Sequence, residues 1–141
     1  MKIRQLSLIE AEYRAHELAR DLMQFDEPMP DFSTRYPGVL ESCLAQPFTI
    51  VGGRYVYFRL TQRAAVLFYL VIKNHPFVNG NKRMAVTLTL VFFYKNNKWL
   101  RVDPYKLYEI ACDVAKSDSR QKETIIKTLN DFFAQSIHER K

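Results

Sequence analysis

A short polar loop between two apolar stretches contains the residues of this chain that are best suited to chemistry. The loop reads His75-Pro-Phe-Val-Asn-Gly-Asn-Lys-Arg83, and apolar residues flank it at 64–72 and 84–94. It supplies an imidazole that can act as a base near neutral pH, a glycine and two cations. A helix that begins near Asn81 would also leave its first backbone N–H groups free to bind an anion. This combination predicts a site that positions a nucleotide phosphate and accepts a proton from an attacking hydroxyl.

Each of these residues also has an ordinary structural explanation when it is taken singly. A histidine near a helix end is most often structural, and we interpret His16 and His138 in that way. Pro76 can simply end the preceding helix. Phe77 is the one large apolar residue of the loop and is expected to anchor it in the core. The loop matches neither a Walker A motif nor a kinase glycine-rich loop, so the functional interpretation depends on the combination.

Size and composition limit the possible classes of protein. The chain has 141 residues, of which 48% are hydrophobic, and we expect a single domain at 1–141. No apolar run reaches the roughly 18–20 residues of a membrane span, and the start lacks a signal peptide, so we expect a cytoplasmic protein without membrane contact. The net charge of +6 suits an anionic ligand or an acidic partner, but no motif for binding nucleic acid accompanies it. Cys43 and Cys112 are expected to be reduced, buried thiols.

Hydrophobic periodicity predicts an all-α bundle of about six helices. Ser7 and Glu10 form a candidate capping box, and Thr61, Asp103 and Ser119 are candidate N-caps of later helices. Residues 25–36 contain two prolines and several polar residues, and they are interpreted as a loop. The expected helices lie at 8–24, 37–46, 81–95 and 104–116, with one more after the Thr61 cap that is apolar over 64–72 and a last one after the Ser119 cap that reaches 137.

One β element is predicted, a hairpin at residues 48–58. Gly52-Gly53 can supply the positive φ angles of a two-residue turn, with β-branched and aromatic residues on both sides. A lone hairpin is marginal in water, so it must pack on helices or receive a partner strand. Two interpretations remain open, a structural flap and a strand edge that binds a peptide by β-augmentation. The candidate docking residues are Thr49, Ile50, Val51, Gly52, Gly53, Arg54 and Tyr55.

The loop sequence HPFVNGNKR resembles the signature of the Fic/Doc (Fido) family, H-x-F-x-[D/E]-G-N-[G/K]-R. Lys82 makes it similar to the Doc (death-on-curing) branch, which contains the toxins of toxin–antitoxin pairs. The segments LESCLAQP and AVLFYLVIKNHPF and the hairpin also resemble that branch, so the likeness extends from about Gly38 to the last helix. The resemblance implies a helical fold whose members transfer part of a nucleotide onto a protein hydroxyl.

Matching positions of the signature imply roles for the loop residues. His75 would be the general base, and Phe77 would anchor the loop in the core. The hairpin would be the flap that aligns the target segment. The anion-binding turn would consist of Gly80, Asn81, Lys82 and Arg83, with Arg83 on a phosphate of ATP.

The resemblance leaves two reactions open. Most Fic enzymes transfer AMP from ATP, whereas Doc-type toxins phosphorylate a translation elongation factor. The long cationic side chain of Lys82 fills space that a glycine leaves open, and it can displace a nucleotide from the pose that a glycine permits. We therefore expect transfer of the γ-phosphoryl group of ATP to a Ser, Thr or Tyr hydroxyl of a target protein, with adenylyl transfer as the alternative. Because Thr124 departs from the internal inhibitory motif of some Fic proteins, a separate antitoxin protein is the expected partner.

One residue departs from the signature and concerns the metal. Asn79 stands where the family has the Asp or Glu that binds Mg²⁺, and an amide oxygen lacks the charge that a hard cation prefers. Three interpretations follow. The metal is held mainly by the nucleotide phosphates, or catalysis at the site is slow, or the chain is a non-catalytic Fic-fold binding protein. Retained catalysis is favoured because His75 and Arg83 remain for proton transfer and charge stabilisation.

Overall fold

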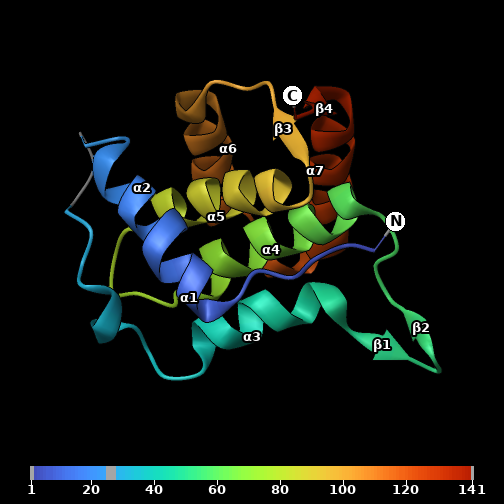
Figure 1. Cartoon of the computed structure of the whole chain (residues 1–141), viewed down its shortest axis with the longest axis horizontal. Coiled ribbons are helices and arrows are strands. Elements are labelled where there is room, and N and C mark those ends of the chain that lie inside the picture. The colour runs from blue at the N-terminus through green and yellow to red at the C-terminus, as the bar shows by residue number, and fades with distance from the viewer. Residues whose placement is uncertain (1, 25–27, 141) are drawn as a thin grey trace.

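Two antiparallel helices, α4 (Leu60–Asn74) and α5 (Asn81–Lys95), form the centre of the molecule. The computed structural model describes residues 2–24 and 28–140 of the chain, and Figure 1 shows the other helices packed around this central pair. Every residue of α4 from Arg63 to Ile72 is buried, as expected for a helix that is apolar on nearly all sides. Among the described residues, no helix is both long and apolar enough to cross a membrane.

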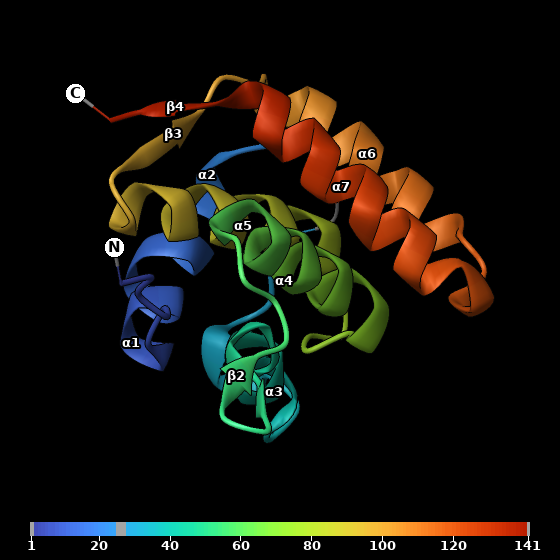
Figure 2. The same cartoon turned by 90° about the vertical axis from the view of Figure 1, so that its right-hand side faces the viewer.

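The outer elements cover different sides of the central pair. A continuous helical segment near the N-terminus packs on α5, α3 packs on α4, and α6 and α7 cover the remaining side (Figures 1 and 2). The prediction of a mostly helical domain is confirmed. The outer elements are α1 (Leu8–Glu10), the π-helix η1 (Ala11–His16), α2 (Glu17–Asp21), α3 (Val39–Ala45), α6 (Pro104–Lys116), α7 (Lys122–Ser136) and the 3-10 turns η2 (Phe32–Thr34), η3 (Gln46–Phe48) and η4 (Ser119–Gln121).

The structure confirms two of the predicted helix starts. The Ser7 hydroxyl accepts a hydrogen bond from the Glu10 N–H, and the Glu10 carboxylate accepts one from the Ser7 N–H, which completes the capping box. The Asp103 side chain accepts from the N–H of Tyr105 at the start of α6. The first helix ends at Asp21 rather than near residue 24. The predicted loop at 25–36 contains η2, and its residues 25–27 lie outside the described part of the chain.

Two predicted caps were wrong. The Thr61 hydroxyl donates to Asn130 Oδ1 at 2.7 Å, so it joins α4 to α7 instead of capping α4. Ser119 opens the 3-10 turn η4, and the Asp118 carboxylate caps that turn by accepting from a backbone N–H two residues on. In both cases a neighbouring polar residue competes for the same local role, and only the tertiary structure decides between them.

Two small antiparallel sheets lie at the surface. The predicted hairpin is confirmed: β1 (Ile50–Val51) pairs with β2 (Arg54–Tyr55) through a turn at Gly52-Gly53, where φ is +58° and +79°. The second sheet, β3 (Lys98–Leu100) paired with β4 (Ile137–Glu139), was not predicted. Its strands are short and far apart in sequence, so no local turn signal marks their pairing.

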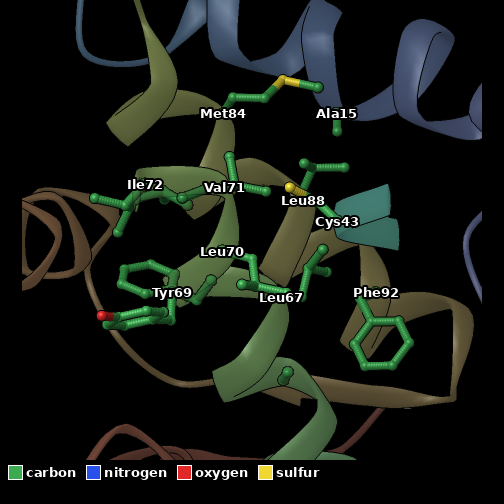
Figure 3. Close-up of a cluster of buried hydrophobic side chains, with 14 of the residues drawn as sticks. Ala15, Cys43, Leu67, Tyr69, Leu70, Val71, Ile72, Met84, Leu88 and Phe92 are labelled. Atoms are coloured by element: carbon green, nitrogen blue, oxygen red, sulfur yellow. The ribbon is translucent and has the colours of Figure 1, made fainter. Parts of the chain in front are cut away.

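The main core lies between α4 and α5 and extends to the flanking helices. Figure 3 shows Met84, Leu88 and Phe92 from α5 near the side chains of α4, with Cys43 of α3 beside them. Burial raises the pKa of the Cys43 thiol to about 11, which makes it a poor nucleophile. Both thiols are free in the structure, and the expected burial holds for Cys43 but not for Cys112, which is half-buried.

Candidate functional site

The loop between α4 and α5 brings the candidate base to the start of the second helix. His75 ends α4 with a left-handed backbone (φ +51°), and Gly80 precedes α5 in the same region (φ +77°). These two residues reverse the chain within a short loop, at one end of the helix pair (Figure 1). The imidazole Nδ1 of His75 consequently lies 3.3 Å from the side-chain Nδ2 of Asn81, the first residue of α5. No side chain caps α5 in the described structure, so its first N–H groups face the same region.

The Asn81 side chain holds the loop together, a role that the sequence did not indicate. Its Oδ1 accepts from the N–H of Phe77 at 3.0 Å, and its Nδ2 donates to the Phe77 carbonyl at 2.9 Å. These two bonds determine which end of the amide is nitrogen, so the group facing His75 is a donor. The Nδ1 of a neutral His75 therefore accepts, and its proton lies on Nε2. Nε2 cannot accept a proton while it carries one, so the ring must change tautomer or orientation before this nitrogen can act as the base. The 3.3 Å contact between Nδ1 and Asn81 is long enough to break easily during such a change.

Phe77 anchors the loop in the core, in agreement with the expectation from sequence. Its side chain is only 1% exposed and lies 5.6 Å from the ring of His16 and 5.9 Å from that of Phe32. His16 is itself buried, and its Nε2 donates to the Pro30 carbonyl at 2.8 Å. The structural interpretation of His16 is therefore confirmed, and the π-helix η1 ends at this residue.

We expect His16 to make the protein less stable as the solution becomes acidic. Burial lowers the pKa of His16 below its ordinary value of 6.5, so the unfolded chain binds this proton more readily than the native chain. The free energy of unfolding should then fall as the pH drops below about 6.5, by at most about 1.4 kcal/mol per pH unit, and level off below the native pKa. Urea unfolding measured between about pH 7.5 and 5 tests this slope.

Two variants separate His16 from other titrating groups. The slope should disappear in His16→Gln and persist in His138→Gln, because His138 is exposed at the surface. A slope of equal size in His16→Gln would assign the acid sensitivity to another residue.

Gly80 has a neighbour that the sequence analysis did not anticipate. A Cβ at this position would lie 2.4 Å from the Sδ of Met29 and 3.7 Å from the Cδ of Pro30. The positive φ angle therefore favours glycine at this position, and a larger residue would also have to move the flexible Met29 side chain. Where a close approach of ligand to the Gly80 backbone was predicted, the described structure has the thioether of Met29.

The two cations of the loop differ in their surroundings. Arg83 is 2% exposed, and its guanidinium donates to the Ala19 carbonyl, which ties α5 to α2. Arg83 also lines a cavity of about 350 Å³ together with Arg20 and Met29. Since Met29 contacts Gly80, this cavity lies beside the start of α5. Lys82 is partly exposed, and within the described residues no carboxylate lies within ion-pair distance of it.

The donor set suits a metal ion only weakly. The Oδ1 of Asn79 is buried and accepts no hydrogen bond from the described residues, so it could bind a cation. Residues 2–24 and 28–140 contain no cluster of three His, Cys, Asp or Glu side chains. One neutral amide oxygen is a poor site for Mg²⁺ by itself, and the ion's other ligands would have to be phosphate oxygens and water.

The structure does not bring the hairpin to the loop. The hairpin precedes α4 and the loop follows it, and the two lie at opposite ends of this helix in Figure 1. A helix of 15 residues is about 22 Å long. The alignment of a target by Thr49 to Tyr55 therefore stays a prediction, and such a target would have to extend along the molecule to reach His75.

Arg63 attaches the base of the hairpin to α4, a contact that sequence reasoning missed. Its guanidinium lies 4.8 Å from the ring centre of Phe48 and 4.2 Å from that of Tyr55, and its Nε donates to the Tyr57 carbonyl at 2.8 Å. The sequence does contain a signal, because Arg63 directly precedes the long apolar run of α4. These contacts satisfy the requirement that the hairpin pack on a helix.

The protein is a mostly helical domain, and the loop between its two central helices contains a histidine, a phenylalanine, a Gly-Asn pair and an arginine in that order. This combination places it in the class of proteins with the Fic fold. The sequence profile of the Fic/DOC family matches residues 7–93, and the chain belongs to this family. Members of the family are generally nucleotidyl- or phosphotransferases. The match includes the N-terminal helical segment, whereas the resemblance found from sequence began at about Gly38. The match ends within α5, before β3.

A curated relative agrees with the family assignment. Over 73 residues the chain is 34% identical to a protein named Toxin Doc from Mycolicibacterium smegmatis. The alignment covers 52% of this chain and 56% of the relative, so the chain spans about half the length of the curated protein that it matches. No solved structure shows a significant match.

Proposed function

We propose that this protein is a Doc-like toxin that phosphorylates a target protein. The hydroxyl oxygen of a Ser, Thr or Tyr residue would attack the γ-phosphorus of ATP, and His75 would accept the hydroxyl proton. The new O–P bond would form as the bond to the β,γ-bridging oxygen breaks, with ADP as the leaving group. In line with the Doc resemblance, the proposed target is a translation elongation factor, and the proposed site of action is the cytoplasm.

The position of His75 supports this proposal most directly. Its imidazole is exposed and contacts the first residue of α5, whose N-terminal N–H groups are suited to a phosphate. A base and an anion site are thus adjacent, as a transfer to a hydroxyl requires. Lys82 in the first turn of α5 would add positive charge near the transferred group.

Phosphoryl transfer is preferred to adenylyl transfer because of Lys82. This side chain takes up space beside the start of α5 where other family members have a glycine, which changes the pose that a triphosphate can adopt. Mg²⁺ bound with ATP would neutralise phosphate charge, and Asn79 is the residue of this chain that could contribute an oxygen to it. An antitoxin protein is the proposed partner, which the name of the curated relative suggests.

Labelled ATP distinguishes the reactions. The protein and Mg²⁺ are incubated with a cell lysate and ATP that carries its label on either the α or the γ phosphate. We expect protein-bound label from the γ phosphate alone. Label from the α phosphate would replace the proposal with adenylyl transfer, and no transfer from either, equally in the parent and in His75→Ala, would indicate a non-catalytic binding protein.

Restoring the carboxylate at residue 79 tests the weakened metal site. Asn79→Asp supplies the negative charge that a hard cation prefers, so we expect a lower Mg²⁺ concentration for half-maximal transfer and a faster rate at limiting Mg²⁺. The rate is measured across a Mg²⁺ titration, with Asn130→Asp on α7 as the matched control. An unchanged Mg²⁺ dependence in Asn79→Asp would show that this residue does not contact the metal.

A further inference from the structure

A second candidate binding site lies at the other end of α4 from the loop. A cleft of about 480 Å³ is bounded by the N-terminal segment, the linker after β2 and the C-terminal end of α5. Four cations line it, Lys2, Arg59, Arg63 and Lys98, and no carboxylate does. Lys98 is already paired with Glu139, so the remaining three cations give the cleft its positive charge.

Both walls of this cleft are held by hydrogen bonds. The Asn96 side chain accepts from the Arg4 N–H at 2.7 Å and donates to the Arg4 carbonyl at 3.0 Å, which attaches the N-terminal segment to the end of α5. On the opposite side, Arg63 holds the linker through the Tyr57 carbonyl. A ligand would therefore enter a preformed site, at little cost in ordering the protein.

The charge on Arg63 gives the strongest indication of what the cleft binds. This residue is 4% exposed, and within the described residues no carboxylate lies within ion-pair distance of its guanidinium. Burial lowers the pKa of Arg63, because desolvation disfavours its charged form, and the partners described for it are two aromatic rings and a carbonyl. A carboxylate is the natural counterion for a guanidinium, because it can accept two parallel hydrogen bonds. Lys2 and Arg59 at the rim would attract further negative charge.

The apolar surface of the cleft indicates a polypeptide as the source of that carboxylate. Phe58 is 79% exposed, the largest exposure among the large hydrophobic residues of the described chain, and the adjacent Tyr55 is also exposed. Among the described residues, the β1–β2 sheet has no third strand, so the backbone of β2 is unpaired at its outer edge. The cleft is a short hollow with one buried arginine, whereas a nucleic acid requires an extended basic groove.

We propose that this cleft binds an acidic, extended segment of a partner protein, with one carboxylate on Arg63 and an apolar side chain against Phe58. The proposal does not depend on catalysis, because it concerns residues outside the loop from His75 to Arg83. A finding that the protein is non-catalytic would therefore not contradict this proposal.

A model peptide of alternating Glu and Leu tests the proposal on the full chain. We expect this peptide to shift the amide NMR signals of Ile3, Phe58, Leu60 and Asn96 and to bind more weakly as salt is added. The same peptide with Gln in place of Glu should not bind. Equal binding of both peptides, no binding at millimolar concentration, or tighter binding of a single-stranded oligonucleotide to the same residues would overturn the proposal.

Paired variants test the role of the cations. The double variant Lys2→Gln/Arg59→Gln changes only exposed residues and should weaken the peptide by roughly two- to thirtyfold. Its control is Lys106→Gln/Lys116→Gln on α6, which removes the same net charge from exposed residues elsewhere and should have little effect. If both double variants lost the same amount of peptide affinity, the effect would come from the overall charge of the protein, which would contradict a specific site.

Discussion

Replacing His75 by alanine is expected to lower the rate of phosphoryl transfer by about 10²- to 10⁴-fold, the usual contribution of a positioned general base. The side chain is exposed, and the one hydrogen bond that it makes in the described structure is the long contact with Asn81. The substitution should therefore leave the thermal unfolding midpoint almost unchanged. Initial rates with γ-labelled ATP and a melting curve on the same sample separate the two effects.

His138 provides the matched control for this experiment. It is an exposed histidine on β4, outside the loop, and His138→Ala should retain the parent rate. If His75→Ala transferred phosphate at the parent rate, the assignment of His75 as the base would be wrong. If both variants lost activity, the cause would be a general effect of removing histidines.

Replacing Phe77 by alanine is expected to produce the largest loss of stability in the loop, about 3–5 kcal/mol. The fully buried ring packs against His16 and Phe32, and alanine would leave a cavity at the point where the loop joins the core. Urea unfolding gives the change in free energy. Transfer activity should fall as well, because Asn81 holds the loop through the backbone of Phe77.

The neighbouring Val78 is a strict control, since it occupies the same loop with its side chain 70% exposed. Val78→Ala should change the free energy of unfolding by no more than about 0.5 kcal/mol. Equal losses in Val78→Ala and Phe77→Ala would show that the loop, and not the buried ring, determines the effect.

The features that could be predicted from sequence are those encoded locally. The helix from Asn81 to Lys95, the capping box of Ser7 with Glu10 and the glycine turn of the hairpin each depend on residues a few positions apart. The motif loop was predicted for the same reason, because nine consecutive residues contain its whole pattern.

The features that could not be predicted depend on residues distant in sequence. The ring of His16 contacts Phe77 only after the N-terminal helical segment has packed on α5, and no periodicity indicates that contact. The pairing of β3 with β4 joins strands separated by the whole of α6 and α7. The placement of the hairpin and of His75 at opposite ends of α4, by contrast, follows from their order in the chain.

The contact between Met29 and Gly80 affects how ligand affinity should be interpreted. A ligand that approaches Gly80 from the side where a Cβ would lie must first displace this thioether, whose unbranched side chain can adopt several rotamers. The dissociation constant measured for such a ligand then equals its intrinsic value divided by the fraction of molecules in which Met29 has moved away. A weak apparent affinity for nucleotide would therefore reflect the rarity of the open conformer as well as the strength of the contacts made within it.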